Sequence, residues 1–250
     1  MLIFAISILS LLMATSVRAD ITNVNSAAGF SRIELAQELP IKNMQKLLGL
    51  SDGKVYFAKN DGSVGEVDKD GKEIQVFQAM DAKGKPILQH PEAVAFSDGT
   101  IYVVDSKTNL VAMFSSQGKF KGSFGTNTAG GFFGGGNENA LNSPHGIAIQ
   151  DGIVYVADSG NGRVQLFGIN GVFLATLEIE STPENAYAKA KGLPYKLHKP
   201  SDIAINALGE IYVLDSDDDL IKVYNPHGVY IKILPEKVKA LSFSMASDGV

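Results

Sequence analysis

One short pattern occurs four times in this chain: a glycine, two further residues, and then a tyrosine inside an apolar run. In the last three copies an aspartate follows the tyrosine by three residues, and another glycine follows that aspartate by thirteen. Repeats of about 40 to 50 residues with several short strands each are typical of β-propeller blades. The repeat therefore constrains the fold more than any other feature of the sequence. The tyrosines are Tyr56, Tyr102, Tyr155 and Tyr212.

Each copy is predicted to form four short strands separated by glycine-containing turns. The first two strands are apolar at nearly every position, which indicates a sheet that is covered on both faces. A lone blade would leave one apolar face in water, so each blade needs a neighbour. Asp158, at the end of a second strand, is predicted to bond the amides of the following turn. In the clearest copy the strands cover residues 146–149, 153–157, 163–167 and 172–177.

The stretch SPHGIAIQDGIVYVADSGNGRVQLF, residues 143–167, resembles an NHL repeat. The pattern of that family is a proline, a Gly-Ile-Ala strand, a Tyr-Val-Ala-Asp strand and then Asn-x-Arg-Val. The copies that begin at Pro91 and Pro200 keep this framework but lack the Asn-x-Arg element. The resemblance covers about residues 41 to 250, and it implies an all-β, NHL-type β-propeller, which is usually six-bladed.

The repeats set the domain boundaries that we expect. Residues 1–19 are a predicted signal peptide, residues 20–40 an N-terminal segment, and residues 41–250 the propeller. About four blades and part of a fifth are too few for a closed ring, which favours a fragment of a longer protein. Alternatively, residues 21–39 supply closing strands. The expected blades cover residues 41–80, 88–126, 141–178, 198–236 and, in part, 238–250.

The first residues predict export to a bacterial periplasm or to the medium. The apolar run from Leu2 to Ala14 is too short to span a bilayer, and Val17-Arg18-Ala19 fits a signal peptidase site. We expect no stable membrane insertion after cleavage. No basic residue precedes Arg18, so an uncleaved anchor is the alternative. The sequence has no cysteine, so disulfides do not stabilise it.

The charge of the chain bears on its partners. The formal net charge is −5 at pH 7, and it becomes about −6 when Arg18 is removed with the signal peptide. This charge argues against nucleic acid as the main partner, although some NHL propellers bind RNA. We expect a protein, a peptide or a glycan instead.

Ionisable residues lie ten positions before each tyrosine, where the first strand of a blade is expected to enter the mouth of the channel. Glu92, His145 and Asp202 at this ring could together hold a divalent cation. Lys46 in the same ring would repel a cation, so we expect no cofactor, with Ca²⁺ or Zn²⁺ as the metal if one binds. The resemblance adds support, because related peptide-amidating lyases place metal-binding histidines at this mouth and gluconolactonase-type propellers place carboxylates there.

Loops around the channel mouth carry the remaining candidate residues, because propellers place their variable segments there. The link at residues 129–136 contains Phe132 and Phe133, which could contact a ligand or pack over the seam between two blades. Residues 182–192 are predicted to form a short capped helix that ends before Gly192. The candidate ligand-binding residues are Phe132, Phe133, Asn161, Arg163 and Tyr195.

Two functions are compatible with these residues. The first is an exported, non-enzymatic propeller that binds a protein, peptide or glycan through loops at the channel mouth, with no catalytic residues. The second is a metal-dependent lyase or lactonase with Glu92, His145 and Asp202 as the metal ligands.

Overall fold

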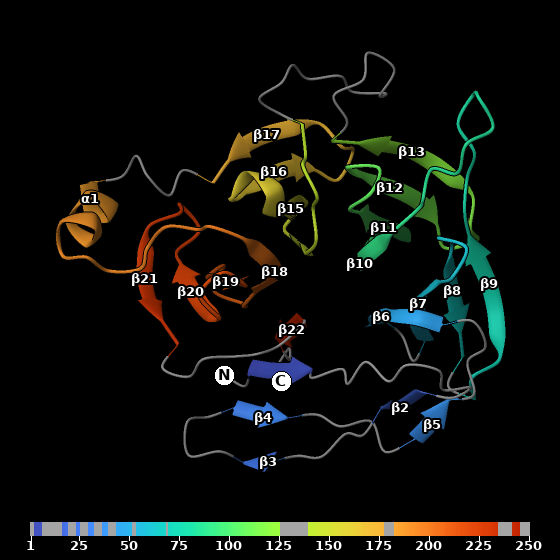
Figure 1. The fold of residues 1–250 in the computed structure, drawn as a ribbon, viewed down its shortest axis with the longest axis horizontal. Helices are drawn as coiled ribbons and strands as arrows, with labels where there is room; N and C mark the ends of the chain where they lie inside the picture. Colours follow the sequence, from blue (N-terminus) through green and yellow to red (C-terminus); the bar gives the residue numbers. More distant parts are fainter. Residues whose placement is uncertain are drawn as a thin grey trace. The chain divides into compact units, whose positions relative to one another are not determined.

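A computed structural model describes residues 44–51, 54–68, 70–125, 140–177 and 183–234, together with six short strands outside these ranges (Figure 1). The chain divides into two compact units, which are described separately. Unit 1 comprises Met1–Ser7, Asn23–Ile33 and Gly146–Val250. Unit 2 comprises Ile8–Thr22 and Glu34–His145.

Unit 2 contains two antiparallel four-stranded sheets, or blades, whose strands follow one another in sequence order. The two blades share an apolar core. The ring centroids of Tyr56 and Phe96 lie 4.7 Å apart, and those of Phe77 and Phe114 lie 5.8 Å apart. Each blade therefore covers an apolar face of the other. The strands are β6 (Met44–Ser51), β7 (Lys54–Lys59), β8 (Val64–Val67) and β9 (Glu73–Phe77), then β10 (Pro91–Ser97), β11 (Thr100–Asp105), β12 (Leu110–Ser115) and β13 (Phe120–Phe124).

Unit 1 contains two blades of the same kind. Tyr155 and Val164 of the first blade share a buried core with Ile203, Val213 and Tyr224 of the second. The all-β fold and the stacked four-stranded repeats predicted from the sequence are thus confirmed. The strands are β14 (Ile147–Gln150), β15 (Ile153–Asp158), β16 (Arg163–Gly168) and β17 (Phe173–Thr176), then β18 (Pro200–Ile205), β19 (Ile211–Asp215), β20 (Leu220–Tyr224) and β21 (Tyr230–Ile233).

The six short strands come from both ends of the chain. In unit 1 they form a sheet in the order β22-β1-β4-β3, and β22 neighbours β18. In unit 2, β2 pairs with β5. The predicted signal peptide and the boundaries of the partial fifth blade stay predictions. The strands are β1 (Ile3–Ile6), β2 (Val17–Ala19), β3 (Val24–Asn25), β4 (Phe30–Arg32), β5 (Gln37–Leu39) and β22 (Ser242–Met245).

A buried aspartate ends the second strand of three blades, and each of these residues is fully shielded from solvent. Asp105 Oδ1 accepts hydrogen bonds from the backbone N–H groups of Lys107 at 3.0 Å and Thr108 at 2.9 Å. Its Oδ2 accepts from the N–H of His90 at 2.7 Å. One carboxylate therefore ties the turn after β11 to the segment that leads into β10. Asp158 and Asp215 occupy the same place in the unit 1 blades.

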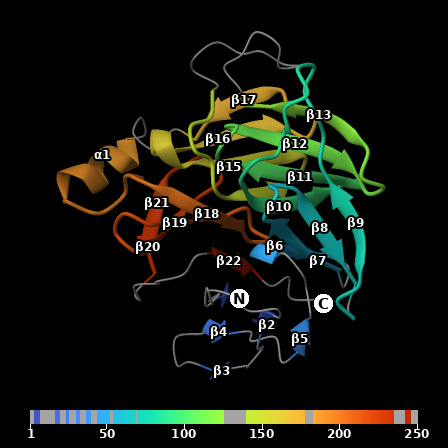
Figure 2. The ribbon, with the colours of Figure 1, turned by 45° about the vertical axis from the view of Figure 1, so that its right-hand side comes forward.

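The predicted short helix is present as α1 (Pro183–Ala190), and it lies beside β21 (Figures 1 and 2). Gly192 follows its end with a φ of +67°, a conformation that glycine adopts without steric cost. The buried Asn185 fastens the helix to the blade: its Nδ2 donates to the carbonyl of Gly228 at 3.0 Å, and its Oδ1 accepts from the N–H of Tyr230 at 2.8 Å. No helix in the described part of the chain has the length and apolar character that a membrane crossing needs.

Replacing Asn185 by alanine should lower the free energy of unfolding by about 2 to 3 kcal/mol, because it leaves the buried carbonyl of Gly228 and the partly buried N–H of Tyr230 without this partner. Equilibrium unfolding in urea, followed by circular dichroism, measures this loss. The matched control is Lys189→Ala on the exposed side of the same helix, which should change stability by about 0.5 kcal/mol or less. Equal stability of the two variants would contradict the role of Asn185.

Candidate functional site

Glu92 occupies a bulge near the start of β10. Pro91 pairs with Asp105, and Ala93 pairs with the adjacent Val104, so Glu92 is an extra residue in the ladder. Bulges are frequent next to functional sites because they redirect a side chain. The Glu92 residue is only 8% exposed, and a carboxylate buried to this extent needs polar partners.

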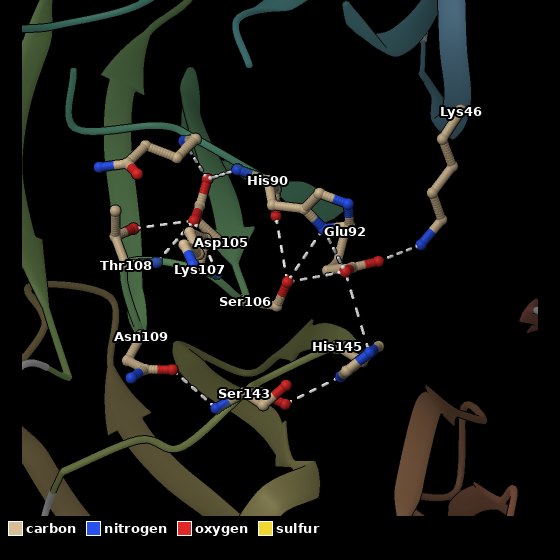
Figure 3. A network of polar contacts seen from close by, with 11 residues as sticks. Lys46, His90, Glu92, Asp105, Ser106, Lys107, Thr108, Asn109, Ser143 and His145 are labelled. Carbon is tan, nitrogen blue, oxygen red and sulfur yellow. Dashed lines mark hydrogen bonds and ion pairs between the residues drawn. The ribbon is translucent and has the colours of Figure 1, made fainter. Parts of the chain in front are cut away.

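The four partners of Glu92 come from separate parts of unit 2 and form, with Glu92, what we call the Glu92 cluster (Figure 3). Oε2 pairs with Nζ of Lys46 on β6. Oε1 accepts a hydrogen bond from Oγ of Ser106 at 2.8 Å and lies 2.8 Å from Nδ1 of His90. Nε2 of His145 lies 3.8 Å from the same oxygen. The cluster consists of Lys46, His90, Glu92, Ser106 and His145.

Opposing effects act on the Glu92 carboxyl. Burial favours its neutral form, but the hydrogen bond and positive charge of Lys46, the hydrogen bond from Ser106 and the nearby His145 outweigh burial. The pKa of Glu92 is therefore held below its ordinary value of 4.5. At neutral pH the cluster contains an ionised carboxylate matched by one ammonium group.

Both imidazoles of the cluster are oriented through Nδ1. Nδ1 of His145 lies 2.8 Å from the backbone carbonyl of Ser143, and a carbonyl oxygen only accepts hydrogen bonds. Nδ1 of His90 faces the Glu92 carboxylate, which likewise accepts when ionised. In its neutral form each ring therefore carries its proton on Nδ1 and presents Nε2 as a hydrogen-bond acceptor. The His90 side chain is 51% exposed and that of His145 is 32% exposed, so both can meet a ligand.

The structure brings together three of the ring residues named from the sequence: Lys46, Glu92 and His145. Asp202 lies on β18 in unit 1, where its Oδ1 accepts from the N–H of Ile203 at 2.9 Å. The predicted metal site of Glu92, His145 and Asp202 stays a prediction.

The pairing of the strands shows which residues of different blades are equivalent. It gives a different result from counting ten residues back from each tyrosine. The alanine that pairs with the repeat tyrosine is Ala95 in one blade and Ala204 in the other. Three residues before these alanines lie Glu92 and Ser201, so Ser201 rather than Asp202 corresponds to Glu92. Counting back from the tyrosine placed Asp202 in the ring because the turn after Ala204 is one residue longer than the turn after Ala95.

Sequence reasoning missed His90 and Ser106 as members of the cluster. A signal for Ser106 was present, because a serine directly follows the strand-ending aspartate in the last three copies of the repeat. His90 directly precedes the proline of its repeat, but no other copy has a histidine there. Its contact with Glu92 depends on the bulge, which the sequence pattern does not reveal.

Asn161 and Arg163 lie around the buried Asp158 of unit 1. Nδ2 of Asn161 and Nε of Arg163 each donate to Asp158 Oδ2 at 2.8 Å. The Asn-x-Arg element thus closes the turn between β15 and β16. The ligand contacts predicted for these two residues stay predictions.

The other candidate ligand contacts lie elsewhere. Tyr195 is 8% exposed and belongs to the apolar core of unit 1, where its carbonyl accepts from the hydroxyl of Tyr224 at 2.6 Å. Phe132 and Phe133 fall outside the described residues. Their predicted roles stay predictions.

A second group of ionisable residues, formed by His198, Asp215 and Asp218 in unit 1, has ligand atoms within 4.8 Å of one another. The ammonium of the buried Lys222 lies among them. Its Nζ lies 2.8 Å from Asp215 Oδ2, 2.7 Å from Asp218 Oδ2 and 2.6 Å from the carbonyl of Lys196. These three contacts match the three hydrogens of an ammonium group, so a lysine supplies the positive charge that the two acids require.

Three comparisons place the chain among known proteins. Residues 141–167 match the family model of the NHL repeat. No curated protein sequence matches the chain. A solved structure of a catalytically inactive virginiamycin B lyase from Staphylococcus aureus with quinupristin is similar at 12% identity and a TM-score of 0.51, over 76% of this chain and 54% of that one.

A streptogramin B lyase structure is similar at 13% identity and a TM-score of 0.52, over 76% of this chain and 53% of that one. The selenomethionine-substituted lyase from Staphylococcus aureus gives 14% identity and a TM-score of 0.52, over 77% and 56%. This chain thus spans about half the length of the structures that it matches. At such identities the likeness establishes the β-propeller fold.

Glu92→Gln should lower the free energy of unfolding at pH 7 by about 2 kcal/mol, because it removes the charged partner of Lys46. Since the pKa of Glu92 is depressed by folding, its contribution is full above pH 4.5 and is lost as the pH falls through the folded-state value. The gap between wild type and variant should therefore close on acidification, in urea unfolding measured from pH 7 to pH 3.

The control for this experiment is Glu73→Gln, which removes an exposed ion pair with Lys59. It should cost about 0.5 kcal/mol or less at pH 7. A Glu92→Gln variant whose deficit is unchanged between pH 7 and pH 3 would contradict the charged state that we assign to Glu92.

Proposed function

We propose, from the premise that this chain is a β-propeller that carries an NHL repeat, that it is an exported, non-enzymatic scaffold that binds a protein, peptide or glycan at the Glu92 cluster. The observation that carries the proposal is the engagement of both Glu92 oxygens by groups of the protein itself. A carboxylate engaged in this way fixes the groups around it. It is not left open for chemistry of its own.

The exposed groups of the cluster suit a polar ligand without a large net charge. Lys46 and Glu92 balance each other, so the cluster attracts neither strong anions nor strong cations. The ammonium donates hydrogen bonds, whereas the two Nε2 atoms accept them when the imidazoles are neutral. Hydroxyl and amide groups offer both donors and acceptors, and these are the groups that glycans and peptides present.

The residues of the cluster do not fit a divalent cation well. A metal at Glu92 would have to displace Lys46 or lie beside its ammonium, where like charges repel. Neither Ca²⁺ nor Zn²⁺ therefore has a part in the proposed function. The apolar run at residues 2–14 and the signal peptidase pattern support export.

We expect a glycan array and a displayed peptide library to identify ligands whose binding depends on the cluster. His90→Ala and His145→Ala should each weaken binding about tenfold or more, since each removes an exposed hydrogen-bonding group from the site. Lys119→Ala, an exposed turn residue of the same unit, should leave binding unchanged. The proposal fails if neither library gives a ligand, or if every ligand binds the histidine variants as well as wild type.

A second candidate function is a lyase, and the position of His145 favours it. Its Nε2 lies 3.8 Å from the Glu92 carboxylate. Nε2 could accept a proton from a substrate, and the negative charge of Glu92 would stabilise the protonated ring. Two of the solved structures of similar fold are, by their names, a virginiamycin B lyase and a streptogramin B lyase.

Incubation with quinupristin, followed by liquid chromatography and mass spectrometry, separates the two candidates. The binding proposal predicts that the compound stays unchanged. Conversion by the wild-type protein, with its loss in His145→Gln, would instead establish the lyase.

A further inference from the structure

Asn109 occupies the last position of the turn between β11 and β12, with a φ of +56°. Asparagine tolerates this left-handed conformation better than most residues. Its side chain reaches the segment that precedes β14, where Oδ1 accepts the backbone N–H of Ser143 at 2.7 Å (Figure 3). The turn of one blade therefore holds the backbone that carries His145.

Ser143 itself has a φ of +46°, which is unusual for a residue with a side chain. It also directly precedes Pro144, and a proline restricts the backbone of the residue before it towards extended conformations. A conformation with this cost persists only where neighbouring groups hold it. The hydrogen bond that the Ser143 N–H donates to Asn109 Oδ1 holds this peptide.

The conformation of Ser143 has a direct effect on His145. It places the Ser143 carbonyl 2.8 Å from Nδ1 of His145, which fixes the proton on that nitrogen in the neutral ring. Nε2 lies 3.8 Å from Glu92 Oε1, beyond hydrogen-bonding distance, so in the neutral ring it can accept a hydrogen bond from a ligand. Figure 3 shows this chain of contacts from Asn109 through Ser143 to His145 and Glu92.

We propose that Asn109 is a positioning residue that sets the hydrogen-bonding role of His145. By holding Ser143 in its left-handed conformation, Asn109 makes Nε2 of His145 an acceptor that selects O–H or N–H groups of a ligand. The selection of ligand groups rests on the proposed function of the Glu92 cluster, whereas the setting of the tautomer does not.

The residue at this position differs in the two blades of unit 1. The equivalent position is Gly162 in one blade of unit 1 and Asp219 in the other, with φ values of +63° and +58°. Glycine keeps the left-handed backbone but has no side chain to accept a hydrogen bond. Asn109→Gly therefore removes the contact to Ser143 without straining the turn, and Asn109→Asp keeps an acceptor oxygen in place.

The test is a long-range ¹H–¹⁵N correlation spectrum of protein labelled with ¹⁵N-histidine, at pH 8, with the His145 signals assigned through His145→Gln. Wild type should show a protonated Nδ1 and an unprotonated Nε2 on His145. Asn109→Gly should populate the Nε2–H tautomer, whereas Asn109→Asp should retain the wild-type tautomer. Asp219→Gly, the matched change in the other unit, should leave the His145 signals unchanged.

Two outcomes overturn the proposal: a wild-type His145 that is protonated on Nε2, or a folded Asn109→Gly protein with the wild-type tautomer. The wild-type spectrum alone decides the first, even if a variant does not fold. The tautomer is measured without a ligand, so it is independent of the glycan and peptide screens. If the screens give no ligand, the proposed function is rejected. If Asn109→Gly nevertheless shifts the tautomer of His145, the positioning role of Asn109 is retained.

Discussion

The burial of both apolar faces of each blade is the constraint on which the rest of the structure depends. Strands such as β11 and β19 are buried at every position, so their sheets are stable only with neighbours on each side. In unit 2 this stacking is made by aromatic rings of two blades, which pack 4.7 to 5.8 Å apart. Lys46 and Glu92 lie near the start of the first strand of each of these two packed blades.

Burial also determines how the polar groups at the strand starts must behave. A carboxylate that loses water needs charge and hydrogen bonds in return, and Glu92 obtains them from Lys46, Ser106 and His90. The same requirement is met in unit 1 by Lys222 between Asp215 and Asp218. In both places a lysine supplies the positive charge that a metal would otherwise bring. In both places the protein's own groups therefore hold the carboxylates in fixed positions.

The sequence predicted the blades because their signals are local: apolar runs, turn glycines and a regular tyrosine. It also predicted that Lys46, Glu92 and His145 belong to one ring, since they share a place in the repeat. It gave Asp202 the repeat position of Glu92, whereas the strand register gives that position to Ser201, because the turn after Ala204 has one additional residue. His90 was missed because its contact with Glu92 depends on a bulge, and bulges leave little trace in a single sequence.

We propose that Lys46 neutralises Glu92, so that the Glu92 cluster recognises ligands by hydrogen bonds and binds no metal. Elemental analysis by mass spectrometry, on protein purified without chelator and dialysed against Ca²⁺ or Zn²⁺ and then against metal-free buffer, tests it most directly. We expect far less than one metal ion per chain in wild type and in Glu92→Gln alike. About one ion per wild-type chain, lost in Glu92→Gln, would contradict it.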